Sequence, residues 1–145
     1  MIGLLQRVLS ASVTVDGQIV GAIGRGILVF VGVEHDDDER RAQRLLDRVL
    51  GYRVFADGAG RMNLSVLDVA GGVLFVPQFT LAADTTKGMR ASFTPAAGAV
   101  LGQQLFDFLV AQARGHCPEL ASGVFGADMK VALVNDGPVT FWLRV

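Results

Sequence analysis

The chain has few of the side chains that perform ordinary hydrolytic chemistry. Its imidazole and thiol groups belong to His35, His116 and Cys117. His35 lies in an acidic run that is typical of a solvated loop, while His116 and Cys117 follow the end of a predicted helix, where capping and packing account for them. A Ser–His–Asp or Cys–His site needs a positioned imidazole, and a zinc site needs ligands a few residues apart. We therefore predict no triad, no metal and no cofactor.

Two short segments favour recognition by main-chain groups instead. Gly137-Pro138 lies between two apolar runs, which is typical of a turn. The carbonyl groups of such a turn can point outward, and its proline carries no N–H. The second segment, residues 77–80, follows a predicted buried strand. These two places are therefore the first candidates for a functional site.

The strands that must position these segments follow from apolar patterning. Asp16-Gly17 separates two alternating runs, as in a type I′ hairpin. Residues 27–33 and 73–76 are continuous apolar runs, which indicate strands buried on both faces. At the end of the chain we predict two strands, residues 129–134 and 139–145, joined by an Asn-Asp-Gly-Pro turn.

Two helices complete the predicted elements. The first spans residues 39–50, where acidic residues precede an apolar stripe, and the second spans about residues 97–114. Four arginines crowd the outer side of the first helix, a pattern that fits a solvated face better than a phosphate-binding one: Arg40, Arg41, Arg44 and Arg48. Mainly antiparallel strands covered by two helices predict a mixed α/β, layered fold in one domain, residues 1–145.

Length and composition exclude several classes of protein. The chain has 145 residues, 51% of them apolar and 19% charged, which suits one folded domain and excludes a disordered chain. Its apolar runs are too short to cross a membrane, and its single cysteine suits a reducing compartment. The net charge of −1 argues against DNA or RNA binding through many phosphates. The high mean hydropathy, +0.44, favours burial of apolar surface between subunits.

Several motifs occur in the order that is typical of one family. Residues 78–84 and 135–140 are the most specific, and shorter motifs lie at residues 6–8, 12–15, 48–53, 62–64, 88–90 and 127–129. With these motifs the whole chain resembles the bacterial D-aminoacyl-tRNA deacylases. The resemblance implies a barrel-like, partly mixed sheet covered by two helices. It also implies a cytoplasmic homodimer that hydrolyses the ester between a D-amino acid, or glycine, and the 3′ adenosine of tRNA, which recycles mischarged tRNA.

The resemblance also implies catalytic roles. Gln78, Phe79 and Thr80 would line the reaction site, and their backbone N–H groups would stabilise an oxyanion. Gly137 and Pro138, joined by a cis peptide bond, would enter the partner subunit's active site. Their carbonyl groups would hold the substrate ammonium, and the turn would collide with an L side chain. A nucleophilic hydroxyl on Thr80 ranks second, because no histidine is placed to activate it.

Further residues complete the implied site. Met129 would border the pocket and Arg7 would fix the Gly-Pro turn. Pro77 stands where the family motif usually has serine, and proline at this place is typical of a related branch that acts on small L-aminoacyl-tRNAs. A deacylase of relaxed chirality is therefore one alternative. Two others are a non-enzymatic dimeric binding module and an esterase of small molecules.

The contacts with tRNA are predicted from charge. The basic residues nearest the motifs are Lys87, Arg90 and Lys130. We expect only a few phosphate contacts, concentrated at the acceptor end, and a shallow dependence of binding on salt.

Overall fold

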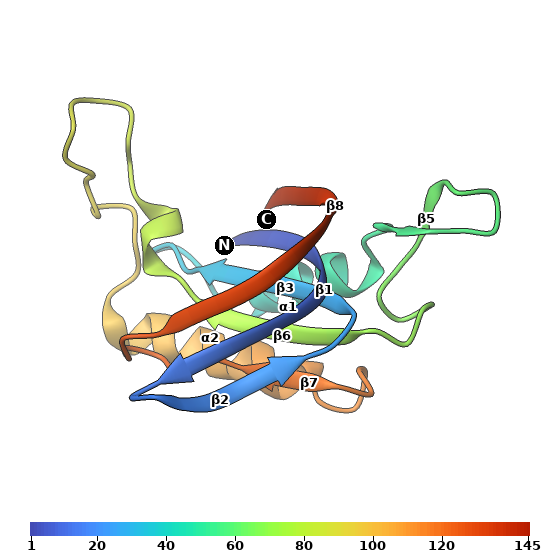
Figure 1. Cartoon of the computed structure of the whole chain (residues 1–145). Coiled ribbons are helices and arrows are strands. Elements are labelled where there is room, and N and C mark those ends of the chain that lie inside the picture. The colour runs from blue at the N-terminus through green and yellow to red at the C-terminus, as the bar shows by residue number, and fades with distance from the viewer.

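The computed structural model describes residues 1–145 and contains one curled six-stranded sheet with two helices (Figure 1). The strand order is β2-β1-β3-β6-β7, and β8 pairs with β1. The strands of this sheet are β1 (Ile2–Val15), β2 (Gln18–Ile23), β3 (Gly26–Gly32), β6 (Gly72–Pro77), β7 (Leu120–Ser122) and β8 (Lys130–Arg144). The other elements are α1 (Glu39–Gly51), α2 (Ala99–Ala113), a short 3-10 turn η1 (Phe79–Ala82), and a separate two-stranded sheet of β4 (Phe55–Ala56) and β5 (Met62–Leu64). The predicted fold class is confirmed.

The long strand β1 organises the sheet. Along one edge its first half pairs antiparallel with β3 and its second half with β2, while β8 pairs along its other edge. Asp16 and Gly17 both have positive φ, 48° and 78°, as a type I′ turn requires. The predicted hairpin is therefore confirmed.

Strands β3 and β6 are parallel neighbours at the centre of the sheet. Their residues are almost all buried, which confirms the interpretation of the two continuous apolar runs. The three-residue strand β7, which pairs parallel with β6, was not predicted, because three half-buried residues give no periodic signal.

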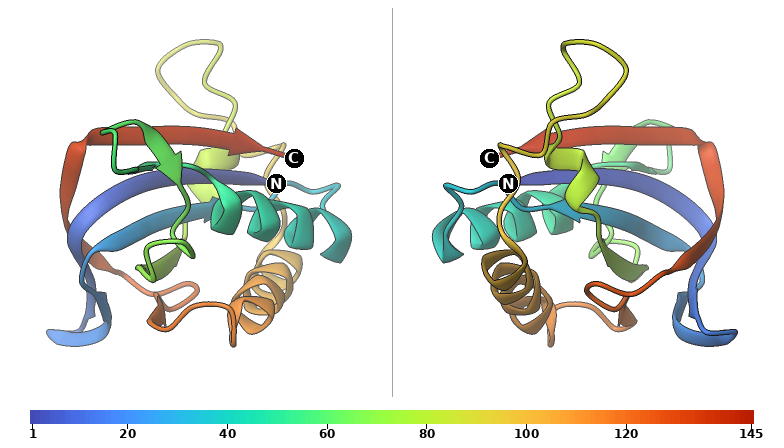
Figure 2. Two further views of the ribbon diagram at one scale, coloured as in Figure 1. Left: turned by 90° about the vertical axis from the view of Figure 1, so that its right-hand side faces the viewer. Right: turned by 90° about the vertical axis from the view of Figure 1, so that its left-hand side faces the viewer.

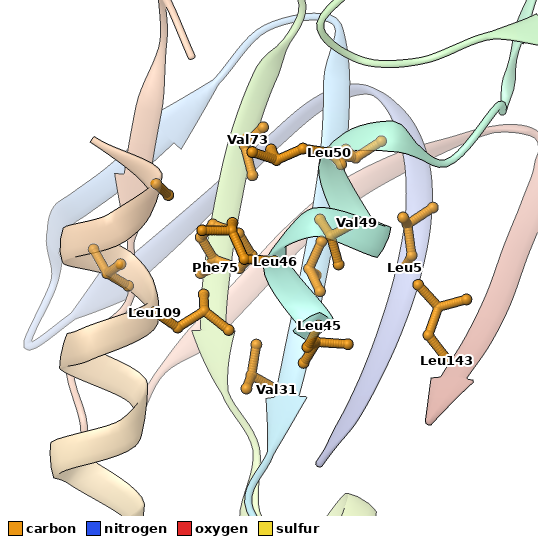
Figure 3. Close-up of a cluster of buried hydrophobic side chains, with 14 of the residues drawn as sticks. Leu5, Val31, Leu45, Leu46, Val49, Leu50, Val73, Phe75, Leu109 and Leu143 are labelled. Atoms are coloured by element: carbon orange, nitrogen blue, oxygen red, sulfur yellow. The ribbon is translucent and has the colours of Figure 1, made fainter. Parts of the chain in front are cut away.

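The main core lies between the sheet and the helices (Figure 3). Asp38 caps the start of helix α1, since its side chain accepts a hydrogen bond from the backbone N–H of Arg41 at 2.8 Å. The apolar faces of α1 and α2 pack against the sheet, and Leu46 and Leu109 lie close to Phe75 of β6. The burial of these side chains fixes the position of β6 and so of the segment that follows it. Neither helix has the length and apolar composition that a membrane span requires.

A second, smaller core fills the inside of the curl. Figure 2 shows how β1 and β8 bend together to form this curl. Leu28 of β3 and Leu74 and Val76 of β6 point into it, because side chains alternate between the two faces of a strand. Met129 and Val131 pack against it from β8 and the segment that precedes it. The end of β6 therefore lies at the rim of this inner core.

One element differs from the prediction. The last two predicted strands are a single strand, β8, which pairs with β1 on both sides of the Gly-Pro segment. Gln6 faces Thr140 and Val8 faces Asn135, so the four residues 136–139 lie opposite Arg7 alone. The Asn-Asp-Gly-Pro sequence is therefore part of a large bulge in a continuous strand and not the turn of a hairpin.

The N-terminal strand is held by ionic contacts. The ammonium of Met1, which is fully buried, donates to Asp37 at 2.6 Å and to Glu34 at 3.0 Å. Arg144 of β8 also pairs with Glu34. Burial raises the pKa of Glu34, but hydrogen bonds from the Met1 ammonium and Arg144 outweigh it and hold that pKa below its usual 4.5.

Candidate active site

The site begins where β6 ends. The N–H of Gln78 donates to the carbonyl of Val31 at 2.8 Å and thus extends the pairing with β3 by one residue. The chain then bends into η1, in which the N–H of Leu81 donates to the carbonyl of Gln78 at 3.2 Å. The N–H groups of Phe79 and Thr80 precede this bond, and N–H groups at the start of a helical turn have no partner within the turn. Within η1 these two N–H groups therefore have no acceptor.

Pro77 fits this place without loss of a ladder hydrogen bond. Neighbouring residues of a strand direct their N–H groups to opposite edges, so the nitrogen of Pro77 faces the side of β7. Strand β7 pairs only with residues 73–75 of β6 and has ended before this point. Proline is tolerated where the ladder is already open.

The side chains of Gln78 and Thr80 contact each other. The amide Nε2 of Gln78 donates to the hydroxyl Oγ1 of Thr80 at 2.5 Å. An amide N–H group is a donor, so it cannot accept the proton of the hydroxyl and does not act as a general base. This contact favours a positioning role for the Thr80 side chain over a nucleophilic one.

A pocket of about 250 Å³ opens beside this segment. Its lining includes Pro77, Gln78 and Phe79 from one side and Ala127 and Met129 from the other. The structure thus brings together two segments that are far apart in the sequence, the end of β6 with the start of η1 and the residues around the start of β8.

Gly123 shapes the wall behind this pocket. A Cβ atom at this position would lie 2.7 Å from Sδ of Met129 and 3.3 Å from Cδ of Pro77. A side chain at this position would therefore displace the side chain of Met129, which lines the pocket. Sequence reasoning missed Gly123, because its role depends on contacts between distant segments.

A second pocket, of about 220 Å³, adjoins the first and is more apolar. The two pockets share Pro77, Phe79 and Gly126, and Phe125 and alanines around the start of α2 complete the second one. Phe79 is 58% exposed and therefore presents its ring at the junction of the two pockets. Phe125 was also missed, although it lies two residues before the recognised motif at residues 127–129.

The two pockets contain no ionisable side chain. Neither His35 nor His116 lines them, and His35 pairs with Asp36 at an exposed site elsewhere. In the whole chain no three His, Cys, Asp or Glu side chains gather in a way that could hold a metal ion. The groups that line the pockets are main-chain, amide and apolar groups, which suit orientation and hydrogen bonding, and the predicted site residue Thr80 lines neither pocket.

The Gly137-Pro138 segment lies at a different place. Both residues are exposed, their peptide bond is cis, and neither lines the two pockets of their own chain. Asn135 supports the bulge, since its Nδ2 donates to the carbonyls of Arg7 and Val139 at 2.9 and 3.0 Å.

Arg7 holds the other side of the bulge. Its Nε lies 3.0 Å from the Asp136 carboxylate and donates to the Asp136 carbonyl at 3.2 Å, and its Nη1 donates to the carbonyl of Val54 at 2.5 Å. The structure therefore places Arg7 against the Gly-Pro segment, between β8 and the chain that leads to β4.

The three basic residues predicted to contact tRNA differ in their surroundings. Lys87 and Arg90 are exposed on the hairpin that follows η1, and neither has a carboxylate partner. Lys130, in contrast, forms an exposed ion pair with Asp128 at 2.8 Å. The two hairpin residues are the freer cations.

The chain is similar over nearly its whole length to known D-aminoacyl-tRNA deacylases. A D-aminoacyl-tRNA deacylase of Thioalkalivibrio sulfidiphilus is 65% identical over 145 residues, which are 100% of this chain and 97% of that protein. The D-aminoacyl-tRNA deacylase of Alkalilimnicola ehrlichii is 62% identical over 144 residues, 99% of this chain and 96% of that protein.

Solved structures agree with the fold. A structure titled "c-Myc DNA Unwinding Element Binding Protein" has a TM-score of 0.95 and 36% identity, and the match covers 100% of this chain and 99% of that one. A probable eukaryotic D-amino acid tRNA deacylase has a TM-score of 0.81, with 99% of this chain and 98% of that one covered. Its 17% identity supports the fold alone.

The family model described as D-Tyr-tRNA(Tyr) deacylase matches residues 4–144, which include the pocket, η1 and the Gly-Pro bulge. With this match and full-length relatives above 60% identity, the chain belongs to the D-Tyr-tRNA(Tyr) deacylase family.

Proposed function

We propose that this protein hydrolyses D-aminoacyl-tRNA and glycyl-tRNA at the ester bond to the 3′ adenosine. Water adds to the carbonyl carbon, the bond to the ribose oxygen breaks, and the products are the free amino acid and tRNA with its 3′-hydroxyl restored. The observation that carries this proposal is a pocket without ionisable side chains, bordered by the first residue of η1, in a chain of this family.

The chemistry requires little from protein side chains. An aminoacyl ester is already reactive, and the neighbouring ribose 2′-hydroxyl can assist the attacking water. The N–H groups of Phe79 and Thr80 would stabilise the negative charge that develops on the ester oxygen. The hydrogen bond from Gln78 to Thr80 orients the hydroxyl and supports this assignment.

The two adjoining pockets would hold the two parts of the substrate's 3′ end, the aminoacyl ester and the adenine. The first pocket would hold the aminoacyl ester beside Gln78 and Met129. The apolar second pocket would hold the adenine, because aromatic rings such as Phe79 and Phe125 provide surfaces on which a base stacks. Lys87 and Arg90, with Lys130 as a weaker contact, would then meet phosphates of the acceptor end.

Chiral selection is assigned to a second subunit. Gly137 and Pro138 are exposed, braced on both sides and away from the pockets of their own chain, which suits insertion into the site of the partner in a homodimer. Their carbonyl groups would accept from the substrate ammonium, and the turn would exclude an L side chain. The exposed Val134 and Trp142 on the same strand are apolar surface that a dimer would cover. We place this reaction in the cytoplasm, where aminoacyl-tRNA is used.

Thr80→Ala tests the assignment of the chemistry to the main chain. Turnover of D-tyrosyl-tRNA should stay within about tenfold of that of the unmodified protein, because the N–H of residue 80 remains. Single-turnover deacylation measures this rate. Complete loss would instead identify Thr80 as a nucleophile, and no hydrolysis by the unmodified protein, even in large excess, would favour the dimeric binding module.

Hybrid dimers test the cross-subunit contact. Gly137→Ala damages the inserted turn, whereas Gly123→Val blocks the pocket. Mixed subunits should regain about a quarter of the unmodified activity, because half of the dimers are hybrid and each has one intact composite site. Absence of any recovery in verified hybrid dimers contradicts insertion into the partner. Hydrolysis of a free amino-acid ester as fast as of the tRNA ester would identify a small-molecule esterase.

A further inference from the structure

A hairpin of residues 83–95 follows η1 and stands out from the body of the molecule (Figure 1). Asp84 and Ser92 close its base through two backbone hydrogen bonds of 2.8 and 2.9 Å. The carboxylate of Asp84 also accepts from the N–H and the hydroxyl of Thr86, and these bonds hold the pKa of Asp84 below its usual value. The base of the hairpin is thus a defined structure and not a loose loop.

Phe93 lies at this base and contacts the site. Its ring centroid is 5.1 Å from that of Phe79, with the rings tilted by 48°. Phe93 is 45% exposed and Phe79 is 58% exposed, so neither ring belongs to a buried core. Aromatic pairs at this separation attract each other beyond the effect of area alone. Phe93 is therefore a neighbour that restricts the side chain of Phe79.

We propose that Phe93 is a positioning residue for substrate binding, an inference that rests on the function proposed above. Phe79 presents its ring at the junction of the two pockets, where the adenine and the aminoacyl group meet. Without Phe93, the half-exposed ring of Phe79 can adopt more rotamers. Binding of the adenine must then restrict the ring to one of them, which has an entropic cost. Phe93 thus acts on the substrate through Phe79.

The effect belongs to binding and not to the chemical step. The backbone of η1 is fixed by hydrogen bonds from Leu81 to Gln78 and from Ala83 to Thr80, and neither bond involves Phe93. The N–H groups of Phe79 and Thr80 therefore keep their direction when Phe93 is shortened. We expect KM to change while kcat does not.

The test compares Phe93→Ala with Phe93→Tyr and Met89→Ala. Phe93→Ala should raise KM about fivefold for both D-tyrosyl-tRNA and D-tyrosyl-adenosine, with kcat within about twofold. Phe93→Tyr keeps the ring and should restore KM. Met89 lies on the same hairpin and is fully exposed, so Met89→Ala is the matched control and should leave both constants unchanged.

The minimal substrate separates this effect from phosphate binding. D-tyrosyl-adenosine has no tRNA phosphates, so charge-removing changes at Lys87 and Arg90 should raise KM for tRNA alone, whereas Phe93→Ala should raise it for both substrates. A double-mutant cycle adds a second readout. In a Phe79→Ala background, Phe93→Ala should have no further effect on KM, because the residue through which it acts is gone.

Several outcomes would overturn the inference. An unchanged KM in Phe93→Ala, a loss of kcat that Phe93→Tyr does not restore, or full additivity with Phe79→Ala each contradicts it. These results would leave the deacylase function standing. Failure of the unmodified protein to hydrolyse either substrate would instead refute the proposed function, and this inference with it.

Discussion

At the scale of single residues, the site depends on positions where only one residue type fits. Gly137 has φ of +126°, a backbone conformation that other residues rarely adopt. A Cβ atom there would lie 2.7 Å from Cγ2 of Val139 and 3.1 Å from Nη2 of Arg7. The shape of the bulge therefore depends on the absence of a side chain at this position.

Gly137→Ala should disrupt the bulge and lower kcat/KM for D-tyrosyl-tRNA by about tenfold or more, since the carbonyl groups that we propose to hold the ammonium would move. Steady-state deacylation measures the change. Gly58→Ala is the control, because a Cβ at Gly58 meets nothing within 4 Å. Equal activity of the two variants would show that the conformation of Gly137 is not needed.

At the scale of elements, Arg7 links β1 to the bulge of β8 and to the chain before β4. A guanidinium reaches acceptors in several directions at once, whereas a lysine ammonium is a single compact donor. The position of the Gly-Pro bulge thus depends on one side chain that belongs to another strand.

Arg7→Lys should lower the ratio of D-tyrosyl- to L-tyrosyl-tRNA hydrolysis by about tenfold, because the turn becomes less fixed. Parallel deacylation of the two esters measures this ratio. Arg61→Lys is the matched control, since Arg61 is exposed and pairs only loosely with Asp57 at 3.9 Å. An unchanged ratio in Arg7→Lys would remove Arg7 from chiral selection.

The conformation of the same bulge could not be predicted from the sequence. Sequence patterns within short segments were enough to predict the Asp16-Gly17 turn, the buried strands and both helices. The Asn-Asp-Gly-Pro segment also contains turn-forming residues. It forms a bulge and not a hairpin turn because the residues on both sides of it pair with β1, which is distant in the sequence. Contacts such as Phe79 with Phe93 and Gly123 with Met129 are invisible for the same reason.

At the scale of the whole molecule, the N-terminal and C-terminal strands are tied together by the contacts of Glu34 with Met1 and Arg144. The pKa of Glu34 in the folded state lies below its usual 4.5. The carboxylate therefore adds stability above about pH 4.5, and this contribution is lost as the pH falls through the lower, folded-state value.

Glu34→Gln should lower the thermal midpoint at pH 7 by about 3 °C or more, and the difference from the unmodified protein should shrink below about pH 4. Thermal unfolding followed by circular dichroism across this pH range measures both effects. A difference that stays constant down to pH 3 would show that the charge of Glu34 does not stabilise the fold.

The distribution of charge predicts how the proposed tRNA substrate is held. The net charge is −1, and Lys130 is already paired with Asp128, which leaves Lys87 and Arg90 as the free cations near the site. Two phosphate contacts correspond to a slope of about −1.4 to −1.8 in log K against log salt. Fluorescence titrations at several salt concentrations measure this slope. A slope equivalent to about six phosphates would contradict contact at the acceptor end alone.

The most direct test of the account is hydrolysis of D-tyrosyl-, glycyl- and L-tyrosyl-tRNA side by side, with the protein titrated over several decades of concentration. We predict rapid loss of the D-tyrosyl and glycyl esters while the L-tyrosyl ester stays intact, because the Gly137-Pro138 turn excludes an L side chain. Hydrolysis of the L-tyrosyl ester at a comparable rate would contradict chiral exclusion and favour the relaxed branch that Pro77 suggests.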